Sequence, residues 1–402
     1  MKTTAQHMLS DRVASMSESA TIKMSQNARN LREQGHNVIS LSLGEPDFDT
    51  PTHIKEAAKK ALDDGYTKYT PVPGLVDYAE AIIEKFKRDN ALHYTRKQIV
   101  VSNGAKQSIA NICLSILNPG DEVIVFAPYW VSYWEIIKFA GGTPVLLYAG
   151  IEQDFKVSPE QLKEAITSKT KAIIFSSPCN PTGSVYTRDE LEGLSEVIKT
   201  HENLLVISDE IYEYINFTGQ HASIGAIDGM QDRTATVNGM AKGFAMTGWR
   251  LGYMGAPEWL AKACAKVQGQ FTSGAASFSQ KAASIALTTS LAPTYDMKEE
   301  FLKRRDIVIE KLGEIPGLQI NHPTGAFYVF PDVSHYFGKS DGNVTINNSE
   351  DLAEILLDKA HVALVAGSAF GADKCMRISY AASEETLKEA IRRIKECLAT
   401  FK

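Results

Sequence analysis

Short apolar runs alternate with longer stretches of helical periodicity through the middle of the chain. The short runs occupy residues 98–102, 122–126, 144–148, 172–175, 204–207 and 235–237, and a helical pattern over residues 105–117 follows the first of them. Several runs are apolar without interruption, which is typical of strands buried on both faces of a mostly parallel sheet. The alternation therefore predicts an α/β fold in which helices cover both faces of that sheet.

The last third of the chain has a different pattern. A charged helical stretch is followed by four short strand-like runs and an amphipathic helical pattern, at residues 292–312, 318–320, 325–330, 362–365, 376–380 and 384–402. This order is typical of a smaller α+β domain. We expect residues 46–290 to form the large domain, residues 291–402 the small C-terminal domain, and residues 1–45 an N-terminal arm and part of the small domain.

Composition and charge exclude several classes of protein. Of the 402 residues, 44% are hydrophobic and 22% are charged, which is ordinary for a globular protein, and the formal net charge of −6 argues against a nucleic-acid partner. No apolar run approaches the roughly 20 residues of a membrane span. The first 25 residues lack the apolar core of a signal peptide. We therefore expect a cytoplasmic protein that binds neither nucleic acid nor membranes.

The cysteines agree with that compartment. They show neither CxxC spacing nor histidine partners at zinc-finger intervals, and they are Cys113, Cys179, Cys264, Cys375 and Cys397. An odd number of unpatterned cysteines is typical of a reducing compartment. We expect neither a disulfide framework nor a metal site.

The candidate chemistry centres on the segment 239–252, Gly-Met-Ala-Lys-Gly-Phe-Ala-Met-Thr-Gly-Trp-Arg-Leu-Gly. Small and apolar residues flank Lys242, so poor hydration should lower the pKa of its amine and make it a nucleophile toward a carbonyl. Eight residues later, Arg250 offers a planar fork of donors suited to a phosphate. An amine for an aldehyde and an arginine for a phosphate are what pyridoxal phosphate requires.

Other candidate residues follow predicted strands, where ligands of α/β sheets collect. Gly104 lies where a strand gives way to a helix, whose first amides can bind a phosphate, although such turns are common. Asp209 ends a buried strand and could keep a pyridine nitrogen protonated, or it could cap a helix. Tyr212 could share that site. Asn180 lies in a rigid turn between two prolines, and Trp130 could stack on a flat ring or belong to the core.

Taken together, these motifs resemble the fold type I, class I pyridoxal phosphate aminotransferases, the group of aspartate aminotransferase. The resemblance covers nearly the whole chain, from residues 44–51, Gly-Glu-Pro-Asp-Phe-Asp-Thr-Pro, to residues 377–380, Arg-Ile-Ser-Tyr. It implies that Lys242 forms the Schiff base and moves the substrate proton. It also implies that Asp209 pairs with the pyridine nitrogen, and that Tyr212 and Asn180 contact the phenolic oxygen of the cofactor.

The resemblance implies further roles around the cofactor and the substrate. Gly104, Ala105 and Arg250 are expected to bind the phosphate, Lys106 to lie beside the cofactor, and Trp130 to stack on the ring. Tyr69 resembles a tyrosine that reaches the phosphate of the neighbouring subunit, which implies a homodimer. Gly44 and Arg377 are expected to bind the substrate α-carboxylate, with Trp130 and Asn180 nearby.

Two departures from the family pattern bear on affinity and specificity. Many relatives carry a serine before the lysine, whereas this chain has Ala241, so one phosphate hydrogen bond of about 1 kcal/mol is missing. One branch binds the distal carboxylate of aspartate with an arginine, but the segment 268–280 contains none. A sister branch uses a lysine at the position of Lys106 and a hydroxyl of the N-terminal arm, which Thr21 supplies.

We therefore predict an aminotransferase that moves an amino group between L-aspartate and 2-oxoglutarate in a two-step cycle through pyridoxamine phosphate. A prephenate or aromatic amino-acid aminotransferase shares every motif and stays open as the alternative. A pyridoxal phosphate lyase and a non-catalytic pyridoxal phosphate-binding regulator also remain. The lyase would consume no oxo acid, and the regulator usually carries an additional DNA-binding segment.

Overall fold

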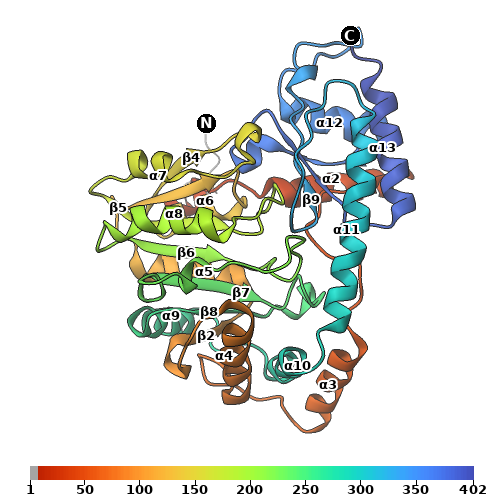
Figure 1. The fold of residues 1–402 in the computed structure, drawn as a ribbon. Coiled ribbons are helices and arrows are strands. Elements are labelled where there is room, and N and C mark those ends of the chain that lie inside the picture. The colour runs from red at the N-terminus through yellow and green to blue at the C-terminus, as the bar shows by residue number, and fades with distance from the viewer. Residues whose placement is uncertain (1–7) are drawn as a thin grey trace.

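A seven-stranded sheet forms the centre of the computed structural model, which describes residues 8–402 (Figure 1). In spatial order its strands are β2 (Ile99–Ser102), β8 (Gly252–Gly255), β7 (Thr234–Gly239), β6 (Leu205–Asp209), β5 (Thr170–Ser176), β3 (Glu122–Ala127) and β4 (Thr143–Tyr148). Within this sheet β8 runs antiparallel to both of its neighbours, and the other pairs are parallel. The predicted α/β fold with a mostly parallel sheet is confirmed.

Alternate residues of the central strands enter different cores, which explains their continuous apolar sequence. Val123 and Val125 of β3 pack in one cluster with helices on one face, whereas Ile124 and Phe126 pack in another cluster on the opposite face. The first face carries α5 (Ala105–Ile116), α6 (Ser132–Phe139) and α9 (Glu258–Phe271). The second carries α7 (Pro159–Ala165) and α8 (Arg188–Lys199). Helices therefore cover both faces, as predicted.

A third cluster covers the β2 end of the sheet. It gathers side chains of α3 (Thr52–Asp63), α4 (Val76–Asn90) and α10 (Ser277–Thr288) around Ile99, Val101 and Tyr253. At the opposite edge, β4 is only partly covered, and Thr143, Leu146 and Tyr148 are exposed. The apolar residues of that run therefore do not mark a strand buried on both faces, in contrast to the neighbouring β3.

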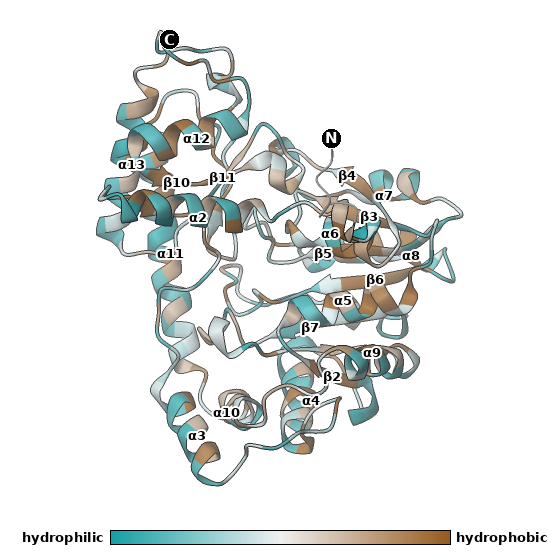
Figure 2. Ribbon diagram, turned by 180° about the vertical axis from the view of Figure 1, so that it is seen from behind, coloured by the Kyte–Doolittle hydropathy of each residue, from teal (hydrophilic) through white to brown (hydrophobic). Residues whose placement is uncertain are grey.

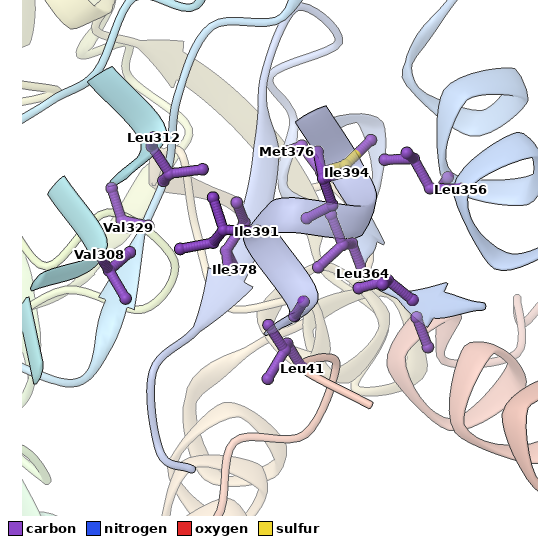
Figure 3. Packing of buried hydrophobic residues seen from close by; sticks show 14 of the residues in the cluster. Leu41, Val308, Leu312, Val329, Leu356, Leu364, Met376, Ile378, Ile391 and Ile394 are labelled. Carbon is purple, nitrogen blue, oxygen red and sulfur yellow. The ribbon is translucent and has the colours of Figure 1, made fainter. Parts of the chain in front are cut away.

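The N-terminal and C-terminal segments share a separate core. Strand β1 (Ile39–Ser40) pairs in parallel with β10 (Val362–Ala363), and an antiparallel sheet has the order β11 (Val365–Ala366), β12 (Met376–Ser379), β9 (Tyr328–Val329). Around these strands lie α2 (Ala20–Glu33), α11 (Ala292–Gly313), α12 (Ser349–Ala360) and α13 (Glu384–Leu398). Figure 3 shows side chains of this core, with Leu312 and Val329 facing Ile391 of α13.

Helix α13 shows how its sequence determines this packing. Ser383 caps its first turn by accepting a hydrogen bond from the Thr386 amide at 3.3 Å, and Glu384 and Glu385 favour the positive end of the helix dipole. Its buried residues recur at helical spacing, whereas its charged residues lie on the solvent side, so hydrophilic and hydrophobic colours alternate along it (Figure 2). The predicted amphipathic helix is present and ends at Leu398.

Several strand predictions in this part of the chain were inexact. Residues 318–320 form no strand but one isolated bridge, between Gln319 and Asp332. The run 325–330 yields the two-residue β9 and an isolated bridge at Gly325, and the run 362–365 is divided between β10 and β11. Strand β8 and the two-residue β1 were not predicted. Among residues 8–402, no helix combines the length and the apolar character needed to cross a membrane.

Candidate active site

Twelve of the thirteen predicted site residues line one cavity of about 290 Å³. The cavity lies beside the carboxyl ends of β5 and β6, the first turn of α5, and the segment that follows β7. Its predicted residues are Thr21, Gly44, Gly104, Ala105, Lys106, Trp130, Asn180, Asp209, Tyr212, Lys242, Arg250 and Arg377. The thirteenth, Tyr69, does not line it, and 97% of that residue is exposed to solvent. The fold therefore gathers residues that are more than 350 positions apart.

Lys242 lies three residues beyond β7, at the wall of the cavity. Its Nζ donates a hydrogen bond to the carbonyl oxygen of Gly44 at 2.5 Å. Burial lowers the pKa of Lys242 to about 8; the Glu45 charge opposes this shift, and the Arg377 and Arg250 charges add to it. The amine is therefore far easier to deprotonate than a surface lysine, and its partner in the chain is a neutral carbonyl. Such an amine can attack an aldehyde.

Asp209 ends β6 and faces the cavity although only 4% of it is exposed. The Tyr133 hydroxyl donates to Oδ2 at 2.6 Å, and the Ile211 amide donates to Oδ1 at 3.3 Å. Burial raises the pKa of Asp209 to about 6, and the two hydrogen bonds counteract part of that increase. Both donors are neutral, so they do not balance the negative charge of the carboxylate. A cationic ligand in the cavity could balance it.

Gly104 and Arg250 form an anion cradle at the first turn of α5. Gly104 has a φ of +85°, and a Cβ there would lie 2.6 Å from Arg250 Nη2, so only glycine fits without displacing the guanidinium. Strand β8 pairs with β2 so that Gly252 faces Ser102, and a side chain on Gly252 would overlap the backbone of Ala105. This close pairing brings Arg250 to the helix amides, where both can bind a phosphate.

Arg377 on β12 is a buried guanidinium whose partners are neutral. It is 2% exposed, and it donates to Asn180 Oδ1 at 2.9 Å and to the Ser42 carbonyl oxygen at 2.5 Å. Its Nε has no hydrogen-bond partner among residues 8–402, and the ring centroids of Tyr328 and Phe370 lie 4.7 and 4.9 Å from Cζ. Burial lowers the pKa of Arg377. A buried guanidinium with neutral partners is suited to bind the carboxylate of a ligand.

Tyr212 meets a residue that was not predicted for the site. Its hydroxyl lies 2.7 Å from the hydroxyl of Tyr328, which also lines the cavity. A Cβ on Gly44 would collide with the Tyr328 hydroxyl, so the absence of a side chain at Gly44 leaves room for both phenols and for Lys242. The sequence run containing Tyr328 indicated only a strand, and nothing local connects it to Tyr212.

The outer part of the cavity carries Lys106, Trp130 and Thr21. Lys106 Nζ lies 4.9 Å from the Trp130 ring centroid, and burial together with the Arg250 charge lowers the pKa of Lys106. Thr21 lies in the first turn of α2, so the N-terminal segment closes this side. Ser176 and Tyr133 also line the cavity and were not predicted. Tyr133 belongs to the aromatic run 128–134 that drew attention to Trp130.

These residues fit the expected cofactor. The cavity supplies an amine for an aldehyde, a buried carboxylate for a ring nitrogen, and a glycine-arginine cradle that a Cβ would fill. When bound, the pyridoxal phosphate would be held by Lys242, by Asp209 and by the first turn of α5 with Arg250. The orphaned Nε of Arg377 remains for the carboxylate of a substrate.

A second buried polar cluster lies behind Asp209. Ligand atoms of Glu210, Glu213 and His221 lie within 4.8 Å of one another. Lys85, which is fully buried, forms an ion pair with Glu213 and donates to Asn90 Oδ1 at 2.6 Å. The ammonium of Lys85 therefore already balances charge in this cluster, which we interpret as an internal ion network.

Comparison with known proteins agrees with the geometry. The profile of the family described as aminotransferase class I and II matches residues 36–394. The bifunctional aspartate aminotransferase and glutamate/aspartate-prephenate aminotransferase of Petunia hybrida is 51% identical over 98% of this chain and 83% of its own length. The aspartate/prephenate aminotransferase of Cereibacter sphaeroides is 47% identical over 96% of this chain and 98% of its own.

Solved structures are similar over the same length. The aspartate aminotransferase of Rhizobium meliloti superimposes with a TM-score of 0.95 at 40% identity, covering 98% of this chain and 100% of that one. The Thermus thermophilus aspartate aminotransferase with maleate superimposes with a TM-score of 0.91 at 43% identity, covering 97% and 99%. The likeness therefore extends over nearly the whole chain.

Proposed function

This chain belongs to the class I and II aminotransferases, and on that premise we propose that it transfers an amino group between L-aspartate and 2-oxoglutarate with pyridoxal phosphate as cofactor. One observation carries the proposal. Lys242, Asp209 and Arg377 line a single cavity, and the hydrogen-bond partners that the chain gives to these three charged groups are neutral. Ligands would therefore complete the site, with a carboxylate for Arg377, a cationic ring nitrogen for Asp209 and an aldehyde for the Lys242 amine. An amino acid and a phosphorylated pyridine aldehyde together supply these groups.

The side chains divide the work between binding and proton movement. When bound, pyridoxal phosphate supplies an aldehyde that accepts the amino group and a ring that delocalises negative charge from the substrate α-carbon. Arg377 binds and orients the α-carboxylate, Asp209 keeps the ring nitrogen cationic, and Arg250 with the amides of α5 holds the phosphate. The Lys242 amine would take the proton from the substrate α-carbon and deliver it to the former aldehyde carbon of the cofactor. Tyr212 and Asn180 orient the phenolic oxygen.

The positions of Lys106 and Thr21 are evidence for a substrate with two carboxylates. Both line the outer part of the cavity, where the side chain of an amino acid held by Arg377 would extend. The maleate in the Thermus thermophilus relative is a four-carbon dicarboxylate, the same carbon skeleton length as aspartate. Prephenate is the second candidate, because the names of the petunia and Cereibacter relatives combine it with aspartate.

A homodimer with shared sites is part of the proposal. Tyr69 is exposed to solvent and does not line the cavity of its own chain, and Phe271 is 68% exposed. Thr70, beside Tyr69, donates to the Ala275 carbonyl oxygen at 3.2 Å, so the loop that carries Tyr69 is anchored to the start of α10. An exposed tyrosine on an anchored loop and an exposed phenylalanine at the end of α9 suit contact with a second subunit.

We retain the domain division at residues 45 and 290 and the cytoplasm as proposals. The separate core shared by the N-terminal and C-terminal segments supports the division. All five cysteines are free thiols, as proteins of a reducing compartment have.

Amino-donor and oxo-acceptor profiling of the purified holoenzyme tests the function. Aspartate, glutamate and phenylalanine are offered with 2-oxoglutarate, oxaloacetate, prephenate and phenylpyruvate, and oxo acid and ammonia are both measured. We expect aspartate with 2-oxoglutarate to be turned over fastest, with one oxo acid consumed for each one formed. In Lys106→Met, the KM for aspartate should rise about tenfold or more, whereas the KM for phenylalanine should change little. Ammonia release without oxo-acid consumption would indicate a lyase instead, and binding without turnover would indicate a regulator.

A further inference from the structure

Tyr133 is a core residue that contacts both Asp209 and Trp130, two of the residues predicted to contact the cofactor. It is the second residue of α6, its ring is fully buried, and it packs with Val125 and Ile174 of the central sheet. Its ring meets Trp130 edge to face, with centroids 5.4 Å apart and planes at 82°. Core packing therefore fixes the position of the Tyr133 hydroxyl at the floor of the cavity.

The hydroxyl of Tyr133 makes the shortest contact of the Asp209 carboxylate. It donates to Oδ2 at 2.6 Å, whereas the Ile211 amide reaches Oδ1 at 3.3 Å. Ser176 pairs with Asp209 across β5 and β6, but its hydroxyl donates no hydrogen bond to the Asp209 carboxylate. One side chain of α6 thus determines how the carboxylate is turned toward the cavity.

The same hydrogen bond acts on the charge of Asp209. Burial raises the pKa of the carboxyl to about 6, the Glu210 charge adds to the increase, and the Tyr133 hydrogen bond and the Lys242 charge oppose it. A carboxylate that loses its best donor becomes more basic. When it faces a ring nitrogen, the two groups share one proton, and a more basic carboxylate takes a larger part of it.

We propose that Tyr133 is a positioning residue, whose hydroxyl holds the Asp209 carboxylate ionised and in one orientation, so that the proton stays on the pyridine nitrogen of the cofactor. The inference rests on the proposed function. In Tyr133→Phe no covalent bond changes, but the shared proton moves from the ring nitrogen toward Oδ2 of Asp209. The ring then withdraws charge from the substrate α-carbon less effectively.

The holoenzyme loaded with pyridoxal phosphate labelled with ¹⁵N in the ring tests this directly. In Tyr133→Phe the nitrogen resonance should move from the wild-type position toward that of the unprotonated ring. The kcat for aspartate should fall about tenfold while its KM changes less than about twofold, because substrate binding groups are untouched. The control is Tyr129→Phe, which removes a hydroxyl in the same cluster from a ring stacked on Trp134 at 5.8 Å. It should leave the resonance and the kcat unchanged.

A double substitution shows whether the Tyr133 hydroxyl acts by positioning the Asp209 carboxylate or only by altering the packing of the core. Tyr133→Phe keeps the buried ring, so equal melting temperatures of the two phenylalanine variants verify the fold. On an Asp209→Asn background, adding Tyr133→Phe should produce no further shift of the resonance, because the hydroxyl acts through the carboxylate. A resonance in Tyr133→Phe identical to that in Tyr129→Phe, or an equal additional shift on the Asp209→Asn background, would overturn the inference. A wild type that binds no pyridoxal phosphate at Lys242 would overturn the proposed function instead.

Discussion

Lys242, Asp209 and Arg377 are buried ionisable groups that form no ion pair within the described residues 8–402. Burial of an unpaired charge is unfavourable, and this explains why the pKa of Lys242 falls to about 8 and that of Asp209 rises to about 6. A structural role alone would not favour three such groups in one cavity. The arrangement is explained if ligands bring a carboxylate to Arg377, a pyridine nitrogen to Asp209 and an aldehyde to Lys242.

Substitution of Asp209 should therefore stabilise the protein when no cofactor is bound. The pKa of Asp209 is raised from 3.8 to about 6, so folding favours the protonated form, and the ionised form destabilises the folded state at higher pH. In Asp209→Asn, the free energy of unfolding of the apoprotein at pH about 8 should rise by at most about 3 kcal/mol. The gain should vanish below pH about 4, where the carboxyl is protonated in both states.

Urea unfolding of the apoprotein at pH about 8 and below pH about 4 measures the change in the free energy of unfolding caused by Asp209→Asn. Asp358→Asn, at an exposed position of α12, is the matched control and should leave the free energy of unfolding unchanged at both. A loss of stability in Asp209→Asn at the higher pH would contradict the account of buried, unpaired charge.

Most residues of the candidate site could be predicted from the sequence, but the hydrogen bonds between them could not. Lys242 and Asp209 follow strand-like runs, so the rule that ligands collect at strand ends selects them. Tyr133 and Tyr328 could not be selected in that way. Their partners, Asp209 and Tyr212, lie 76 and 116 positions away, and the hydrogen bonds form only when the chain has folded.

At the scale of elements, the cradle depends on β8, a strand that was not predicted. This strand has four residues with glycine at both ends, so its sequence lacks the apolar run that marks its neighbours. Its antiparallel pairing with β2 nevertheless places Arg250 beside the first turn of α5. Pairing across a sheet is set by the whole fold rather than by local pattern, and for the same reason the expected strand at residues 318–320 proved to be one bridge.

Gly104→Ala tests the cradle. The new Cβ would lie 2.6 Å from Arg250 Nη2, and the φ of +85° is unfavourable for alanine. We expect the Kd for pyridoxal phosphate, measured by fluorescence quenching of the apoprotein, to rise more than about tenfold. Gly120→Ala is the control, because Gly120 has a φ of +96° but nothing within 4 Å of its Cβ position. It should lose about 1 kcal/mol of stability yet keep the wild-type Kd. Equal Kd values in both variants would remove Gly104 from the site.

At the scale of the molecule, the proposed dimer requires each chain to complete the site of its partner. Lys242 lines the cavity of its own chain, whereas Tyr69 is exposed and does not line it. A single chain would then hold every predicted group except one. Isologous contact between two copies would bring the missing tyrosine to each cavity.

Mixed dimers of a Tyr69→Phe chain and a Lys242→Ala chain distinguish this arrangement from a site within one chain. If Tyr69 serves the partner, one site of each mixed dimer contains both Lys242 and Tyr69, and activity should be about half that of the wild type with unaltered cofactor affinity. If Tyr69 serves its own chain, that site lacks the tyrosine and should show the weaker cofactor binding of the Tyr69→Phe homodimer. Tyr66→Phe, in the same loop, is the control.

The most direct test of the central claim is to locate the cofactor on the chain. Protein loaded with pyridoxal phosphate is reduced with borohydride, digested, and mapped by mass spectrometry. The account predicts one modified lysine, Lys242, and no label or visible cofactor absorbance in Lys242→Ala, whereas Lys106→Met keeps the label. A modification on Lys106, the other lysine of the cavity, or on any further lysine would contradict it.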